Sequence, residues 1–518
     1  MDKAASRSLD ARALVGRPMP MRAKRQMAAG YAMGSACIAA PAPSTTWNTE
    51  SYSTIVENGF RKALDSPLST FSIDVDAASY SNVRRFLTGN SLPPKDAVRI
   101  EELVNYFHYD YPRPDGDDPF SITTELGPCP WEPKHRIVHI GLQGVDIDTD
   151  ELPPSNLVFL LDVSGSMNAA NKLPLLKSAM KMLVNRLDKD DRVAIVVYAG
   201  AAGLVLPSTS GADKSTIIDA LNRLNAGGST AGGAGIKLAY EVAREHYLAK
   251  GNNRVILCTD GDFNVGASSD AAMVRLIEEK RKDGVFLTVL GFGTGNYKDS
   301  KMEQLADKGN GNYAYIDNLL EAKKVLVTEM GATLVTIAKD VKIQVEFNPA
   351  AVEAYRLIGY ENRALKNEDF NDDTKDAGEL GAGHSVTALY EIVPAGTQSD
   401  RGGGVDPLKY QTRAVKKLSD ELLTVKFRYK AADGDTSRLI VQALADEPRD
   451  ELSENFRFSA AVAGFGMLLR ESAHGGSLTW DQVLEMARDA RGRDREGYRA
   501  EFVRLVERAQ LLAADRRS

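Results

Sequence analysis

The stretch NLVFLLDVSGSM, from Asn156 to Met167, decides the fold of this chain. Its uninterrupted apolar run predicts a strand that is buried on both faces, as in the parallel sheets of α/β proteins. The strand leads into Asp162, Ser164 and Ser166, three side chains with oxygen atoms at alternate positions. In an extended or tightly turned segment these side chains can point the same way, so we expect them to converge on one cation.

Apolar strands alternate with amphipathic helices over about residues 154 to 334. Runs such as RVAIVVYA, NRVILCTD and VFLTVLGFG are typical of strands, whereas NKLPLLKSAMKMLVNRL and AGIKLAYEVAREHYLA have the spacing of helices. This rhythm predicts an α/β fold with a doubly wound, mostly parallel, Rossmann-like sheet and helices on both faces. Ligands of such sheets bind outside the carboxyl ends of the strands.

Two further segments bring oxygen atoms to that edge of the sheet. The strand NRVILCTD ends in Asp260, and the loop GGSTAGG presents Thr230 just before a helix. Carboxylates and hydroxyls without a nearby His or Cys are ligands for hard cations, so we expect Mg²⁺, with Mn²⁺ or Ca²⁺ as alternatives to it. The sequence therefore predicts a metal site at an exposed rim, with these ligands: Asp162, Ser164, Ser166, Thr230 and Asp260.

In this order, and on an α/β frame, the five residues resemble the metal-ion-dependent adhesion site of von Willebrand factor type A domains. The resemblance implies that Ser164, Ser166 and Thr230 contact the metal through their hydroxyls, and that Asp162 and Asp260 hold it largely through water. The flanking segments LPPKDAVRIEELVNYFHYDYP and SENFRFSAAVAGFGMLLRES are similar to the bacterial YfbK-type members of this family. The resemblance implies a metal-dependent binding role and names no partner.

The predicted function is the capture of a partner's carboxylate by the cation. Two carboxylates and three neutral hydroxyls leave one coordination position of a divalent ion open, so an Asp or Glu of another protein would complete its ligand shell. No general base lies beside the motif, so we expect no enzyme; a metal-assisted hydrolase and a scaffold with a vestigial site are the alternatives. The candidate partner contacts are the neighbours of the ligands: Met167, Gly228, Ser229 and Asp262.

Segments with period-two alternation lie on both sides of the α/β region. FSITTELG and HRIVHIGLQG precede it, and DVKIQVEFN, SVTALYEIVP, ELLTVKFRYK and SRLIVQAL follow it. We therefore expect the α/β domain to be inserted in an antiparallel β-sandwich, with small helical regions at both ends of the chain. The predicted divisions are a tail or linker (1–46), an α+β flanking domain (47–115), the first part of the sandwich (116–152), the type A domain (153–335), the second part of the sandwich (336–448) and a C-terminal helical domain (449–518).

Composition excludes some partners and leaves the location open. The 518 residues are 43% apolar and 26% charged with a formal net charge of -7, which is typical of a soluble globular protein and not of a nucleic-acid-binding one. No apolar run is long enough for a transmembrane helix. The segment MAAGYAMGSAC has the outline of a lipoprotein leader, but its weak apolar core favours a linker. The resemblance favours the cell envelope, periplasmic or lipid-anchored, with the cytoplasm as alternative, and the oligomeric state stays open.

Overall fold

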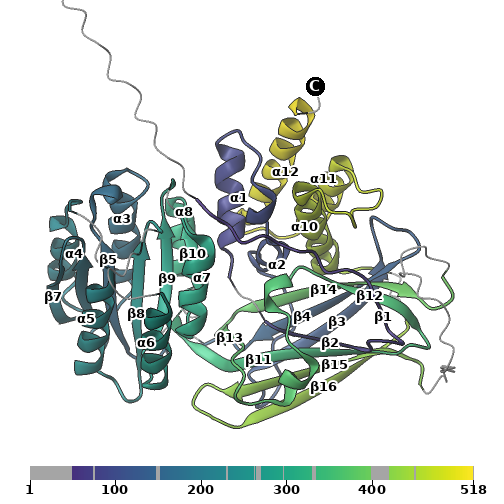
Figure 1. The fold of residues 1–518 in the computed structure, drawn as a ribbon, viewed down its shortest axis with the longest axis horizontal. Helices are drawn as coiled ribbons and strands as arrows, with labels where there is room; N and C mark the ends of the chain where they lie inside the picture. Colours follow the sequence, from purple (N-terminus) through teal and green to yellow (C-terminus); the bar gives the residue numbers. More distant parts are fainter. Residues whose placement is uncertain are drawn as a thin grey trace, which may run out of the picture. The chain divides into compact units, whose positions relative to one another are not determined.

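Three sheets and two groups of helices make up the part of the chain that the computed structural model describes (Figure 1). One compact unit extends from Asn48 to Ser518 and contains all of these elements. The described residues are 50–73, 76–147, 152–228, 232–261, 263, 270–295, 297–329, 334–397, 419–447 and 451–516.

A six-stranded sheet in the order β10-β9-β8-β5-β6-β7 forms the α/β part of the chain. Its strands are β5 (Ser155–Asp162), β6 (Arg192–Tyr198), β7 (Ala202–Ser210), β8 (Asn252–Thr259), β9 (Phe286–Phe292) and β10 (Tyr313–Ile316). Neighbouring strands pair in parallel, except that β7 is antiparallel to β6. Strand β5 lies between β6 and β8, so the strand order reverses there, which is where ligands bind in doubly wound folds.

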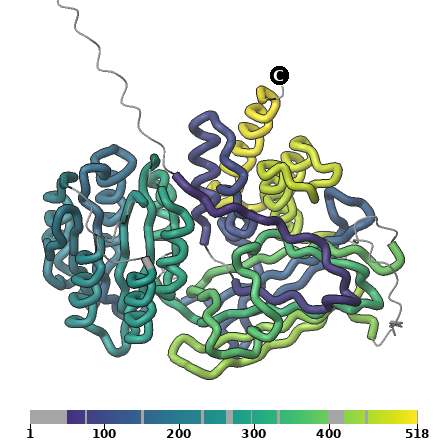
Figure 2. Tube along the Cα trace, viewed as in Figure 1, coloured from purple at the N-terminus to yellow at the C-terminus, as the bar shows by residue number. Residues whose placement is uncertain are grey.

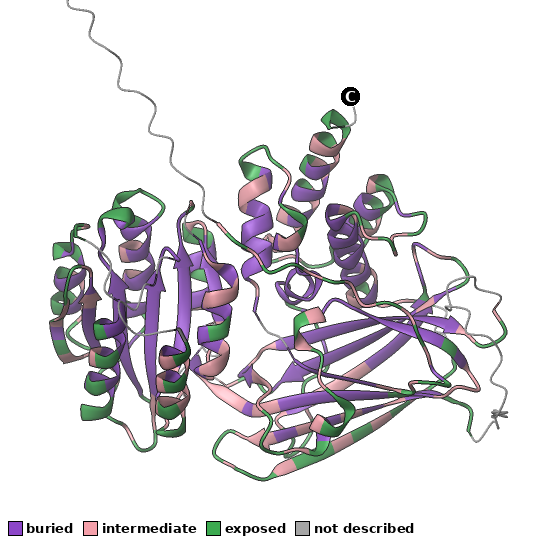
Figure 3. Cartoon of the chain, in the orientation of Figure 1, coloured by how far each residue is buried: buried purple, intermediate pink, exposed green. Residues whose placement is uncertain are grey.

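The side chains of β5 alternate between two apolar cores, one on each face of the sheet. Leu157 and Phe159 belong to one core, and Val158 and Leu160 belong to the other. The covering helices are α3 (Leu173–Val184), α4 (Lys214–Arg223) and α8 (Leu319–Lys323) on the first face, and α5 (Gly232–Glu245), α6 (Asp270–Lys282) and α7 (Asp299–Lys308) on the second. Figure 3 shows the buried strands between helices whose outer faces are exposed. The predicted doubly wound α/β fold is confirmed.

Two antiparallel sheets, β1-β12-β14-β4-β3 and β13-β11-β15-β16, share another core, and β2 also pairs with β11. The strands are β1 (Arg61–Lys62), β2 (Leu68–Ser72), β3 (Phe120–Pro128), β4 (Arg136–Gly144), β11 (Thr336–Phe347), β12 (Val352–Ile358), β13 (Gly378–Gly381), β14 (Ser385–Pro394), β15 (Glu421–Ala431) and β16 (Ser437–Ala445). Strand β4, which precedes the α/β part, pairs with β14, which follows it. The α/β domain is thus inserted in an antiparallel sandwich, as predicted.

Helices from the two ends of the described chain share one core, and Figure 2 shows them in purple and yellow. They are α1 (Ala78–Thr88), α2 (Ile100–Asn105), α10 (Glu454–Arg470), α11 (Trp480–Asp489) and α12 (Tyr498–Asp515). Phe107 joins them, because its ring centroid lies 4.9 Å from that of Phe458 and 5.5 Å from that of Phe502. Within the described residues, none of the helices has the length and apolar character to cross a membrane.

The segment predicted as a flanking domain, residues 47–115, contributes to two other parts of the molecule. Its strand β1 pairs with β12 and its strand β2 pairs with β11, so both belong to the sheets of the sandwich. Its helices α1 and α2 share the core of the C-terminal helices. The predicted domain boundary at residue 115 stays a prediction. The pairing of β1 and β2 and the packing of α1 and α2 show that residues 47–115 link the sandwich to the helical core.

Candidate metal site

The candidate site lies where the strand order reverses. Asp162 is the last residue of β5, and Asp260 directly follows β8. Strands β5 and β8 pair in parallel, with Leu161 opposite Cys258, so both carboxylates emerge at the same edge. Both side chains are fully buried, at 0% exposure, whereas the sequence predicts an exposed rim. They are buried because the loop after β5 folds back on Asp162, and because the side chain of Lys172 covers Asp260 and donates a hydrogen bond to it.

The loop after β5 holds one oxygen of Asp162 and leaves the other without a partner. The backbone N–H of Ser164 donates a hydrogen bond to Asp162 Oδ1 at 2.8 Å. Asp162 Oδ2 is buried and accepts no hydrogen bond from the described residues. The hydroxyl of Ser164 lies 3.0 Å from that of Ser166, in the short 3-10 helix η3 (Gly165–Asn168). The loop thus brings Asp162, Ser164 and Ser166 close together, and their role as metal ligands stays a prediction.

The surroundings of Asp162 shift the pKa of its carboxyl group. The pKa of Asp162 is raised to about 6, because burial and the charge of Asp260 raise it more than the hydrogen bonds from Ser164 and the nearby phenol of Tyr198 lower it. A buried charged group with an unpartnered oxygen is destabilising unless a cation or a donor meets it. Carboxylate and hydroxyl oxygens are the donor set of a hard divalent cation, so the residues fit such an ion. The described residues include no group of three His, Cys, Asp or Glu side chains that could hold a metal instead.

Three of the predicted site residues, Ser229, Thr230 and Asp262, lie outside the described residues. The chain just before Thr230 is placed: the N–H of Gly165 donates to the carbonyl of Gly228 at 3.0 Å. The N–H of Gly227 donates to the carbonyl of Val163 at 2.8 Å. The loop that leads to Thr230 therefore lies against the loop that holds Asp162, as a shared site requires.

The two described candidates for partner contact differ in exposure. Gly228 is exposed and has a φ of +83°, a conformation that glycine adopts without strain. Met167 is 0% exposed and packs in the core under β5 together with Leu173 and Leu176. In this structure Met167 anchors the loop to the core, and its predicted contact with a partner would require this side chain to become exposed.

Sequence patterns give no sign that Lys172 belongs to this site. Its Nζ donates to Asp260 Oδ2 at 2.8 Å, and the exposed fractions of the two side chains are 8% and 0%. Gly293, which follows β9, has a φ of +76°, and a Cβ added there would overlap the methylene groups of Lys172. The sequence shows only that Lys172 precedes an amphipathic helix. A lysine at such a position is common on protein surfaces and does not indicate a site.

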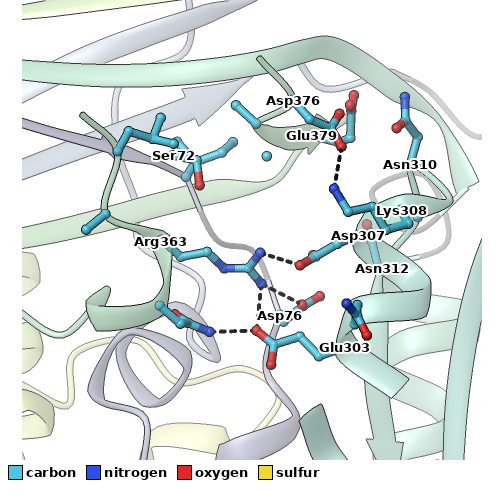
Figure 4. Close-up of a pocket in the computed structure, with 18 of the residues that line it drawn as sticks. Ser72, Asp76, Glu303, Asp307, Lys308, Asn310, Asn312, Arg363, Asp376 and Glu379 are labelled. Atoms are coloured by element: carbon cyan, nitrogen blue, oxygen red, sulfur yellow. Dashed lines mark hydrogen bonds and ion pairs between the residues drawn. The ribbon is translucent and has the colours of Figure 1, made fainter. Parts of the chain in front are cut away.

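A separate cavity of about 500 Å³ lies between α7 and β13, and its lining does not include the candidate metal ligands (Figure 4). Arg363 forms ion pairs there with Asp76, Glu303 and Asp307, at 3.3, 3.0 and 2.7 Å. Glu379 also lines this cavity, and both of its carboxyl oxygens are buried without a hydrogen-bond partner among the described residues. Burial raises the pKa of Glu379 well above its usual range.

Replacing Glu379 with glutamine is expected to stabilise the fold at neutral pH and above. Because its folded-state pKa is raised, wild type loses stability as the pH rises from the ordinary Glu pKa through the folded-state value. The glutamine variant has no charge to bury, so we expect it to gain about 1–3 kcal/mol near pH 8 and little near pH 4. Denaturant unfolding at both pH values measures this, with the exposed Glu368→Gln as control. A gain that does not depend on pH would contradict the prediction.

Three family profiles match the chain in succession. They are described as von Willebrand factor (residues 46–139), von Willebrand factor type A domain (residues 156–327) and Uncharacterized protein YfbK, C-terminal (residues 332–512). The uncharacterized protein YfbK of Escherichia coli strain K12 is 44% identical over 471 residues, which is 89% of this chain and 81% of that protein.

Two more distant similarities concern parts of the fold. The uncharacterized protein sll0103 of Synechocystis is 33% identical over 193 residues, 36% of this chain and 43% of that protein. Among solved structures, a von Willebrand factor type A protein from Catenulispora acidiphila is 15% identical, with a TM-score of 0.40 over 75% of this chain and 89% of that one.

Proposed function

The chain belongs to the YfbK family of proteins that carry a von Willebrand factor type A domain, and we propose that it binds a partner protein through a divalent cation. The type A domain supports an interaction or adhesion function in general. Our proposal is more specific: an Asp or Glu side chain of the partner completes the ligand shell of a cation held at the edge of β5 and β8.

One observation carries the proposal: the buried, unpartnered Oδ2 of Asp162 beside a second buried carboxylate, Asp260. Asp162, Ser164, Ser166 and Asp260, with Thr230 from the adjacent loop, would hold the ion. A bound Mg²⁺, with Mn²⁺ or Ca²⁺ as alternatives, would supply the positive charge that attracts a carboxylate. The chain itself orients Asp162 through the N–H of Ser164 and keeps both carboxylates away from bulk water.

We propose binding and not hydrolysis, because both carboxylates that the structure describes at this edge are proposed ligands of the ion. Asp260 is paired with Lys172, and Asp162 accepts a hydrogen bond from Ser164. Two of the histidines serve the sandwich: His135 lies 2.5 Å from Glu391, and His139 lies 2.7 Å from the hydroxyl of Tyr111. General acid–base catalysis requires a titrating group within hydrogen-bond reach of the substrate.

The proposal is tested by affinity capture with the immobilised wild-type protein in Mg²⁺ and in EDTA. We expect capture of a partner in Mg²⁺, release by EDTA, and competition by free acetate at high concentration. Thr230→Ala should weaken capture together with metal binding, and Asp213→Ala, an exposed position just before α4, should change neither. Capture that survives EDTA, or a Mg²⁺-dependent hydrolytic activity that is lost in Asp162→Ala, would refute the proposal.

A further inference from the structure

Lys172 places a fixed positive charge among the candidate ligands. Its ammonium donates to Asp260 Oδ2 at 2.8 Å, and both side chains are buried. The backbone of Lys172 is held on both sides: its N–H donates to Ala169 at 2.9 Å, and its carbonyl accepts from Leu176 at 2.8 Å. The charge therefore sits at a defined place beside Asp260.

The fold is built to accommodate this side chain. The methylene groups of Lys172 lie against Gly293, where any larger residue would overlap them. Gly293 is fixed in turn, because its carbonyl accepts a hydrogen bond from the Tyr315 hydroxyl at 2.6 Å. A buried ion pair adds little net stability compared with apolar residues of the same size. Stability alone is thus a weak reason for a lysine at this position.

The charges of the described ligands show what the lysine changes. Asp162, Asp260 and Lys172 together carry one net negative charge when ionised, and a divalent ion would turn this into one net positive charge. Without the ammonium, the same ion would be neutralised by the two carboxylates. Coulomb interactions over these short distances are stronger in a buried site than in bulk water, so the ammonium affects the binding of both the cation and an anion.

We infer that Lys172 makes the site selective for anions: its charge weakens the binding of the divalent ion itself and strengthens the capture of a carboxylate by the loaded site. This inference rests on the proposed function and assigns a specificity role to a residue outside the ligand set. Lys172 acts by keeping the loaded site positively charged, so neutral ligands such as water or an amide compete poorly with Asp or Glu of a partner.

The test measures two binding constants on the full chain: Mn²⁺ alone, by calorimetry, and acetate on the Mn²⁺-loaded protein. In Lys172→Met we expect Mn²⁺ to bind about tenfold more tightly and acetate about tenfold more weakly, the factor that corresponds to roughly 1.4 kcal/mol of charge interaction. Lys181→Met, in the helix α3 that follows Lys172, is the matched control and should leave both constants unchanged.

The two possible failures are distinguishable. If wild type binds Mn²⁺ and acetate but Lys172→Met has the same two constants, the role of Lys172 is refuted and the proposed function stands. If wild type binds no Mn²⁺ at millimolar concentration, the proposed function fails and the inference fails with it. Circular dichroism checks the fold, and Lys172→Gln, which also lacks the positive charge but keeps a polar side chain, serves if the methionine variant does not fold.

Discussion

Asp260→Asn is expected to lose divalent-cation binding by about hundredfold or more, which corresponds to roughly 2.7 kcal/mol. The amide keeps the shape of the side chain but removes one of the two carboxylate charges at this edge. It also leaves the ammonium of Lys172, which lies 2.8 Å from Asp260 in wild type, without its counter-charge. The repulsion between this ammonium and the incoming ion adds to the loss of the ligand. Calorimetric titration with Mn²⁺ measures the change.

A double variant separates these two causes. Asp260→Asn combined with Lys172→Met removes the repulsion together with the carboxylate, so we expect it to recover part of the lost Mn²⁺ affinity. The exposed Asp213→Asn is the control and should titrate as wild type does. Unchanged Mn²⁺ binding in Asp260→Asn would show that the cation binds elsewhere.

The fold and the first half of the candidate site could be predicted because they depend on local sequence. A strand buried on both faces needs apolar residues at every position, and β5 has them from Leu157 to Leu161. The hydrogen bond from Ser164 to Asp162 joins residues two positions apart, so the spacing is enough to indicate it. The insertion could be predicted because period-two alternation occurs on both sides of the α/β region.

Other features depend on contacts that no local pattern contains. Lys172 and Asp260 are 88 residues apart, and only the pairing of β5 with β8 brings them together. The sequence around strand β13 is typical of a loop. The strand forms there because it pairs with β11, and this pairing is interrupted by two register shifts. Met167 is buried because it lies in the short helix η3, which directs its side chain into the core while the neighbouring Ser166 stays exposed.

The helical core depends on another long-range cluster, which centres on Arg84 of α1. Its guanidinium forms ion pairs with Asp317, with Glu321 of α8 at 2.7 Å and with Glu501 of α12 at 3.0 Å. The exposed fractions of Arg84, Asp317 and Glu321 are 4%, 9% and 2%. One side chain therefore joins the N-terminal helices, the type A domain and the C-terminal helices.

Arg84→Met is expected to lower the free energy of unfolding by about 3–5 kcal/mol at neutral pH, since it leaves two carboxylates buried without their cation. Burial already raises the pKa of Asp317, and Arg84 opposes this rise, so its removal raises this pKa further. The deficit should therefore be largest at neutral pH and shrink as Asp317 becomes protonated towards pH 4. Denaturant unfolding measures it, with the exposed Arg223→Met as control.

Adding Glu321→Gln to Arg84→Met should restore part of the stability, because one buried charge is then removed. A double variant less stable than Arg84→Met would show that packing, and not charge, makes Arg84 necessary.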